Sequence, residues 1–173
     1  MNIYIMVISD IRVLLKKAQA LELSRYNLYK NNANKVINPD GKNALISLAY
    51  AEKKHLEILK KQFSILKRKN KLDLKYLPKF MEKNYQKSNK RFNSTINAIT
   101  GDINIIKASL KMEKYDAPFY LHLSKRTNNK DAKNLFLILK KEEEKHFKSL
   151  KNKLNDLEDI SFSLTKSKKQ YFV

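Results

Sequence analysis

Apolar residues recur at intervals of three and four through four long segments of this 173-residue chain. That spacing places them along one face of a helix, which is the pattern of an amphipathic helix rather than of a strand. Only two Gly and three Pro interrupt the chain, and their scarcity also favours long helices. The pattern predicts four helices, at about residues 10–31, 39–69, 103–126 and 131–157.

Turn and capping residues mark the ends of these segments. Ser9-Asp10 and Asp131 can each cap the helix that follows, and "NPDG" at 38–41 is a turn directly before a helix start. Gly101-Asp102 predicts a stop followed by a new cap. Pro118 lies inside the third helix, where it removes one backbone hydrogen bond, so we expect a kink there.

The lengths of the connections predict how the helices pair. The connections after the first and third helices are short, so each pair should form an antiparallel hairpin. The long middle connection has room for a short extra helix from Pro78 to about Ile99, and the tail has no clear period and should be loose or packed on a partner subunit. We therefore predict an all-α four-helix bundle that forms a single domain over 1–173, with a first hairpin at about 10–69, a connection at about 70–102, a second hairpin at about 103–157 and a basic tail at 158–173.

The chain contains no Cys. This excludes disulfides, thiolate-bound zinc, cysteine-ligated iron–sulfur centres and thiol nucleophiles, and it is consistent with the cytoplasm. No apolar run approaches the roughly 18–20 residues that a membrane span needs. We therefore expect a cytoplasmic protein that does not span a membrane.

A net charge of +20 makes nucleic acid a candidate binding partner. However, only five of the 37 basic residues are Arg, which leaves 32 Lys, and these are spread over nearly every predicted helix. Clusters of Arg that would grip phosphates with both guanidinium nitrogens are missing from the sequence. We expect nonspecific electrostatic binding at low salt rather than specific recognition of nucleic acid.

Two of the three His follow a Glu by three residues, in Glu52-x-x-His55 and Glu143-x-x-His146. The first and third helices each carry one Glu on the apolar face, Glu22 and Glu113. A single offset of 91 residues relates Glu22 to Glu113, Glu52 to Glu143 and His55 to His146. The chain therefore reads as two diverged helical hairpins, each of which carries one lone Glu and one Glu-x-x-His.

These residue types suit a metal site. Residues three apart share a helix face, so a carboxylate and an imidazole can reach one metal ion together. Four buried carboxylates without compensation would be prohibitively unfavourable, whereas two divalent ions balance their charge. Oxygen and imidazole ligands without sulfur favour iron or manganese, with zinc as a common substitute.

The segments "ALELSRYNLY" (20–29) with "LAYAEKKHLEIL" (48–59), and "MEKYDAPFYLHLSK" (112–125) with "KKEEEKHFKSL" (140–150), resemble the two halves of the rubrerythrin branch of ferritin-like proteins. The resemblance covers roughly residues 10–157 and implies a ferritin-like bundle with two iron ions. It implies that Glu52 and Glu143 bridge the metal ions and that Glu22 and Glu113 bind as terminal ligands. The ligand set that it implies is Glu22, Glu52, His55, Glu113, Glu143 and His146.

The chain departs from rubrerythrins at two points. Rubrerythrins have an additional glutamate one turn beyond the ligand of the third helix, and this chain has Asp116 at that position. Its shorter side chain could bind the metal or act beside it. Their rubredoxin domain with four Cys has no counterpart, so electrons must come from an external donor such as a rubredoxin-like protein. Tyr26, Tyr29 and Tyr120 fall within one or two turns of the ligands, where they could pack in the core, hydrogen-bond a carboxylate or supply an electron.

The resemblance implies reduction of hydrogen peroxide in defence against oxidative stress. The alternatives are a ferroxidase that handles iron with dioxygen as oxidant, a lysine-rich DNA-binding bundle with a vestigial metal site, and a structural bundle without metal. We expect a homodimer. The long connection leaves open whether the six ligands come from one closed bundle or from two chains that exchange hairpins.

Overall fold

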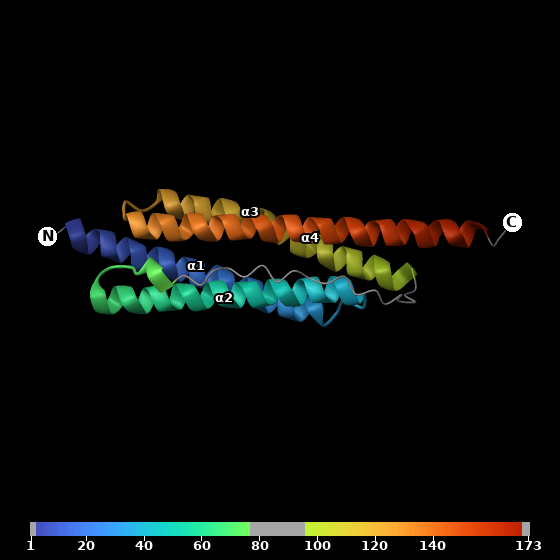
Figure 1. Ribbon diagram of the computed structural model, residues 1–173, viewed down its shortest axis with the longest axis horizontal. Coiled ribbons are helices and arrows are strands. Elements are labelled where there is room, and N and C mark those ends of the chain that lie inside the picture. The colour runs from blue at the N-terminus through green and yellow to red at the C-terminus, as the bar shows by residue number, and fades with distance from the viewer. Residues whose placement is uncertain (1–2, 77–95, 171–173) are drawn as a thin grey trace.

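The computed structural model describes residues 3–76 and 96–170, and helices joined by loops are the only regular elements within these ranges (Figure 1). The predicted all-α four-helix bundle is confirmed. Its elements are α1 (Ile3–Ala33), α2 (Pro39–Lys69), a 3₁₀ turn η1 (Leu74–Tyr76), α3 (Ile96–Lys125) and α4 (Lys130–Gln170).

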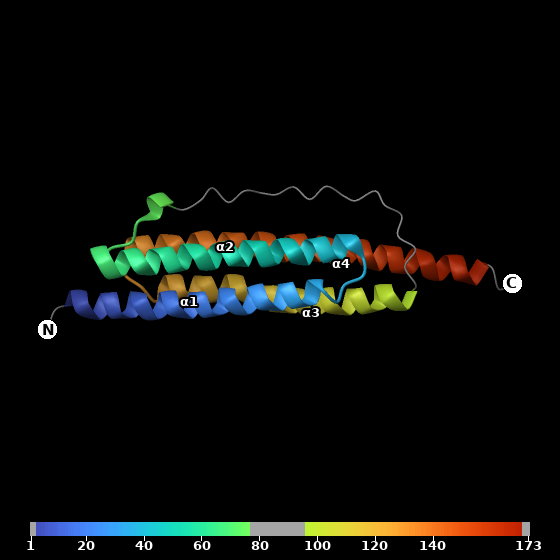
Figure 2. The same cartoon turned by 90° about the horizontal axis from the view of Figure 1, so that it is seen from below.

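The helices pair as the two predicted hairpins. α1 lies antiparallel to α2, and α3 lies antiparallel to α4 (Figure 1). In the perpendicular view, α1 lies beside α3 in one layer and α2 beside α4 in the other (Figure 2). The hairpins therefore meet along two antiparallel helix pairs, α1 with α3 and α2 with α4.

The ends of α2 agree with the prediction because local chemistry fixes both of them. Asn38 accepts hydrogen bonds from the backbone N–H groups of Asp40 and Gly41 at 3.0 Å each, and Pro39 occupies the first turn. At the other end, Asn70 adopts a left-handed conformation (φ 56°) and donates its N–H to Leu66 at 3.0 Å. Both caps are thus formed by residues within one turn of the helix end.

Other helix ends differ from the prediction. α1 begins at Ile3 rather than after Ser9-Asp10, because neither Gly nor Pro interrupts the preceding residues. α4 continues to Gln170, so the tail is helical and not loose over 158–170. Its apolar stripe extends to Leu164, which packs against the core. Asn129 rather than Asp131 caps α4, since it accepts the N–H of Ala132 at 2.9 Å.

The predicted stop at Gly101-Asp102 is wrong, because α3 starts at Ile96 and passes through both residues. Asp102 instead accepts the backbone N–H groups of Ile37 (2.9 Å) and Asn38 (2.6 Å), so it ties the α1–α2 loop to the other hairpin. Most of the short helix predicted from Pro78 lies outside the described residues. α3 also continues through Pro118.

Two apolar clusters fill the bundle on either side of a polar layer. One includes Leu15, Leu59 and Phe136, and the other includes Leu45 and Ile106. Between them every helix contributes an acidic residue to the interior. The described helices include none that is long and apolar enough to cross a membrane.

Candidate metal centre

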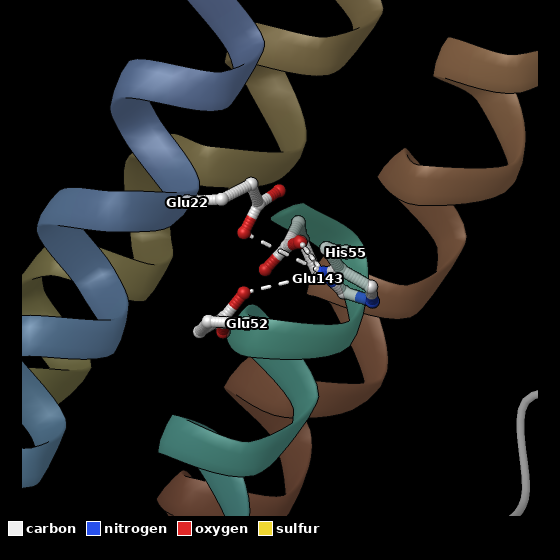
Figure 3. A group of neighbouring side chains, drawn as sticks. All are labelled: Glu22, Glu52, His55 and Glu143. Carbon is white, nitrogen blue, oxygen red and sulfur yellow. Dashed lines mark hydrogen bonds and ion pairs between the residues drawn. The ribbon is translucent and has the colours of Figure 1, made fainter. Parts of the chain in front are cut away.

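All four helices place predicted ligands in the polar layer of the bundle. Glu22 comes from α1 and Glu113 from α3, and the remaining four come from α2 and α4. Figure 3 shows four of the six, Glu22, Glu52, His55 and Glu143. All four Glu and His55 are at most 1% exposed, whereas the side chain of His146 is 12% exposed. The six residues thus meet within the helices of one chain, as in a closed bundle.

The six side chains form two overlapping groups. One contains Glu22, Glu52, His55 and Glu143, and the other contains Glu52, Glu113, Glu143 and His146. In each group one potential ligand atom per residue lies within 4.8 Å of all the others. Glu52 and Glu143 belong to both groups, so each of them lies close to the other members of both.

The contacts between α2 and α4 repeat across the two groups. His55 Nδ1 lies 3.2 Å from Glu52 Oε2, and His146 Nδ1 lies 3.2 Å from Glu143 Oε2. Across the hairpins, His55 Nδ1 lies 3.1 Å from Glu143 Oε1, and His146 Nδ1 lies 3.1 Å from Glu52 Oε1. The 91-residue repeat of the sequence therefore appears as an internal two-fold axis through the site.

Several oxygens at this site lack the hydrogen bonds that buried carboxylates require. Among the described residues, neither oxygen of Glu113 has a well-placed hydrogen-bond donor, and Oε1 of Glu52 and Oε1 of Glu143 each have only a histidine Nδ1 beside them, at 3.1 Å. Buried carboxylates are normally satisfied by protein donors. Oxygens that face one another and two imidazole nitrogens, with few other donors, fit the binding of divalent iron or manganese.

The surroundings of the site shift the pKa values of its acids in different directions. Burial, and then the nearby carboxylate of Glu52, raise the pKa of both Glu22 and Glu113 well above the ordinary value. Burial lowers the pKa of His55 and His146, but the surrounding carboxylates outweigh it and raise both. For Glu52, burial raises the pKa and the two His outweigh it, so the pKa is lowered.

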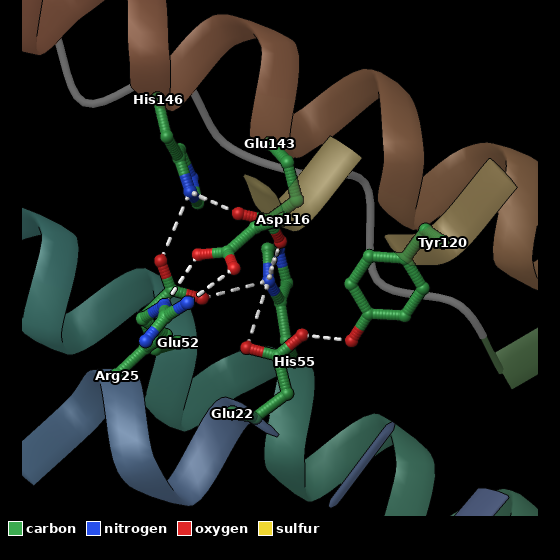
Figure 4. Close-up of polar contacts among 8 residues, drawn as sticks. All are labelled: Glu22, Arg25, Glu52, His55, Asp116, Tyr120, Glu143 and His146. Atoms are coloured by element: carbon green, nitrogen blue, oxygen red, sulfur yellow. Dashed lines mark hydrogen bonds and ion pairs between the residues drawn. The ribbon is translucent and has the colours of Figure 1, made fainter. Parts of the chain in front are cut away.

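The three tyrosines singled out in the sequence occupy different places. The Tyr120 hydroxyl donates a hydrogen bond to Glu22 (Figure 4). Tyr29 is buried beside Glu113, and burial together with that carboxylate raises the pKa of Tyr29. Tyr26 is half-buried in the second apolar cluster, with the Lys30 ammonium 5.7 Å from its ring centre.

Asp116 belongs to neither of the two groups. Both of its oxygens are held by Arg25, through contacts of 2.5 Å to Nε and 2.6 Å to Nη2 (Figure 4). This bidentate pair joins α1 to α3 in the interior. The sequence analysis did not predict it, although Arg25 and Asp116 are separated by the same 91 residues as the ligands.

That spacing locates the pair on the internal axis. The residue numbers of facing positions on α1 and α3 sum to 141 or 142, as expected for two antiparallel helices in register. The hydrogen-bonded pairs that show this are Arg25 with Asp116, Glu22 with Tyr120 and Asn32 with Ser109. A residue of α1 faces its own repeat mate on α3 only where the two numbers both differ by 91 and sum to 141. Arg25 and Asp116 are the pair that meets both conditions. A two-fold axis brings equivalent positions together, and here they carry opposite charges.

Comparisons with known proteins agree with this geometry. A solved structure of a hypothetical protein from Pyrococcus furiosus superimposes with a TM-score of 0.62 and 23% identity, over 86% of this chain and 90% of that chain, which shows a shared fold. No curated protein matches the sequence. The family model for rubrerythrin matches residues 13–154, a range that contains the whole carboxylate and histidine cluster. The chain is thus a ferritin-like four-helix bundle of the rubrerythrin family.

Proposed function

We propose that this protein is a non-haem di-iron oxidoreductase that reduces hydrogen peroxide with electrons from an external donor, in the cytoplasm. The observation that carries the proposal is the pair of buried ligand groups that share Glu52 and Glu143. Membership of the rubrerythrin family supports it further. The site would hold two iron ions, with manganese or zinc as substitutes.

When bound, a pair of ferrous ions supplies one electron from each ion, so that hydrogen peroxide, two electrons and two protons give two molecules of water. The protein's own residues prepare the site for this. Glu22 and Glu113 complete the two ligand groups, and the four negative charges of the Glu side chains match two divalent ions. Tyr120 holds Glu22 by its hydroxyl, which fixes the orientation of that carboxylate.

The apolar clusters on either side keep bulk water from the site. Leu15, Leu59 and Phe136 on one side, and Tyr29 and Ile106 on the other, are fully buried. In a dry interior, electrostatic interactions are stronger than in water. The proposed source of the electrons that reset the site is a separate protein or a small reductant, since the 173-residue sequence contains no Cys that could hold a rubredoxin-type iron.

The test compares the two candidate oxidants. Anaerobic protein loaded with ferrous iron is mixed with hydrogen peroxide or with dioxygen, and the rate of oxidation is followed by stopped-flow absorbance. We expect peroxide to oxidise the iron faster. A clearly faster reaction with dioxygen would overturn the peroxidase proposal and favour a ferroxidase.

A matched pair of variants shows whether the reaction occurs at this site. Glu143→Ala removes a shared ligand and should abolish the fast reaction. Glu144→Ala removes its exposed neighbour, which pairs with Lys140 at 2.6 Å on the surface, and should leave the rate unchanged. Equal rates in both variants would place the chemistry elsewhere.

A further inference from the structure

The internal two-fold axis lets each half of the site serve as a control for the other. Both halves contain one terminal Glu, one His and the two shared Glu. The distances from each His to the shared Glu are the same in both halves, 3.1 and 3.2 Å. Any remaining difference therefore comes from the terminal ligands and their surroundings.

The two terminal glutamates are held very differently. Glu22 accepts a hydrogen bond from Tyr120, and its Oε2 lies 3.6 Å from Nδ1 of His55. In the part of the chain that the structure describes, Glu113 has no well-formed hydrogen bond like that of Glu22 and makes no close ion pair with His146. Tyr29, the repeat mate of Tyr120, lies beside Glu113 and interacts with its carboxylate, but through a looser contact than the hydrogen bond from Tyr120 to Glu22.

The two halves also differ in their access to solvent. The side chain of His55 is 1% exposed, whereas that of His146 is 12% exposed. An ion can therefore reach His146 with less opening of the bundle than it needs to reach His55. The half in which Tyr120 holds the terminal carboxylate is therefore also the less exposed half.

We propose that the two metal positions are unequal. The position formed by Glu22 and His55 is the tight one and fills first, because its terminal carboxylate is already oriented and little ordering opposes binding. The position formed by Glu113 and His146 is the weaker one, through which divalent metal enters and exchanges. This inference rests on the proposed metal centre but not on the oxidant.

The test is a titration of metal-free full-length protein with Co²⁺ under anaerobic conditions, followed by absorbance. We expect two binding steps. Tyr120→Phe removes one hydroxyl and should weaken the tighter step by about tenfold or more, the usual cost of losing a group that orients a ligand. Tyr29→Phe makes the same change at the equivalent position and should alter either step by less than about threefold.

Histidine variants identify the steps independently. His146→Ala should keep one tightly bound Co²⁺ and lose the weak step, whereas His55→Ala should lose the tight step. Circular dichroism shows whether each variant retains the helical fold before its titration is interpreted. If the two Phe variants weaken the same step equally, or if His146→Ala removes the tight step, the inference is overturned.

These outcomes are separable from those of the proposed function. Two equal Co²⁺ sites with symmetric variant effects would overturn the inequality and leave peroxide reduction standing. Unequal sites in a protein that does not react with peroxide would confirm the inference and overturn the peroxidase proposal. Absence of Co²⁺ binding in the wild-type protein would overturn both.

Discussion

The Arg25–Asp116 pair on the internal axis allows a quantitative prediction. Arg25→Met keeps most of the side-chain volume but leaves the Asp116 carboxylate, which is 2% exposed, without its counter-charge. Breaking a buried pair from one side costs about 3–5 kcal/mol, and we expect the lower end, about 3 kcal/mol, because Arg25 remains 13% exposed. For a chain of this length that lowers the melting temperature by roughly 6–12 °C.

The pH dependence of this loss follows from the same pair. Burial raises the pKa of Asp116 to about 6, although Arg25 opposes it, so removing Arg25 should raise that pKa further. A carboxyl group whose pKa is higher in the folded state than in the unfolded state contributes stability at low pH. This contribution is lost as the pH rises through the folded-state pKa. The variant should therefore be closer to wild type at pH 5 than at pH 8.

Thermal unfolding by circular dichroism measures both effects. The double variant Arg25→Met/Asp116→Leu, with an apolar pair, should recover most of the lost stability. As a control, Lys107→Met breaks the surface pair with Glu158, whose side chains are 52% and 42% exposed, and should cost less than about 1 kcal/mol. A loss below about 1 kcal/mol for Arg25→Met, or a double variant as unstable as the single one, would refute this account of the pair.

Two further predictions concern the stability of the fold. Gly101→Ala should raise the free energy of unfolding by about 0.5–1 kcal/mol, because the residue lies inside α3 and an added Cβ meets nothing within 4 Å. A lower melting temperature would contradict this. The metal-free protein should lose stability between pH 6 and pH 8, because the raised pKa values of Glu22, Glu113 and His55 mean that the folded state holds protons which the unfolded state releases. Divalent metal should reverse this trend, since binding requires deprotonated ligands. Greater stability of the metal-free protein at pH 8 would contradict the assignment.

The sequence predicted those features that local chemistry or the internal repeat determines. The start of α2 follows from Asn38 and Pro39, whose effects act within one turn. The six residues of the cluster follow from helical spacing and the 91-residue offset, because residues on one face of each helix must converge in a bundle.

The missed features depend on tertiary contacts. Asp102 looked like the cap of its own helix but instead binds the loop of the other hairpin. The pairing of Arg25 with Asp116 requires the register of α1 against α3, which no local pattern reveals. Likewise, the different surroundings of Glu22 and Glu113 appear only when Tyr120 and Tyr29 are placed in space.

The most direct test of the metal centre is the number of ferrous ions that metal-free protein binds per chain. The titration is done anaerobically, beside the variant Glu52→Ala/Glu143→Ala, which removes both shared carboxylates. The account predicts two tightly bound ions in the wild-type protein and loss of both in the variant. Equal binding by both proteins, or none by either, would contradict it.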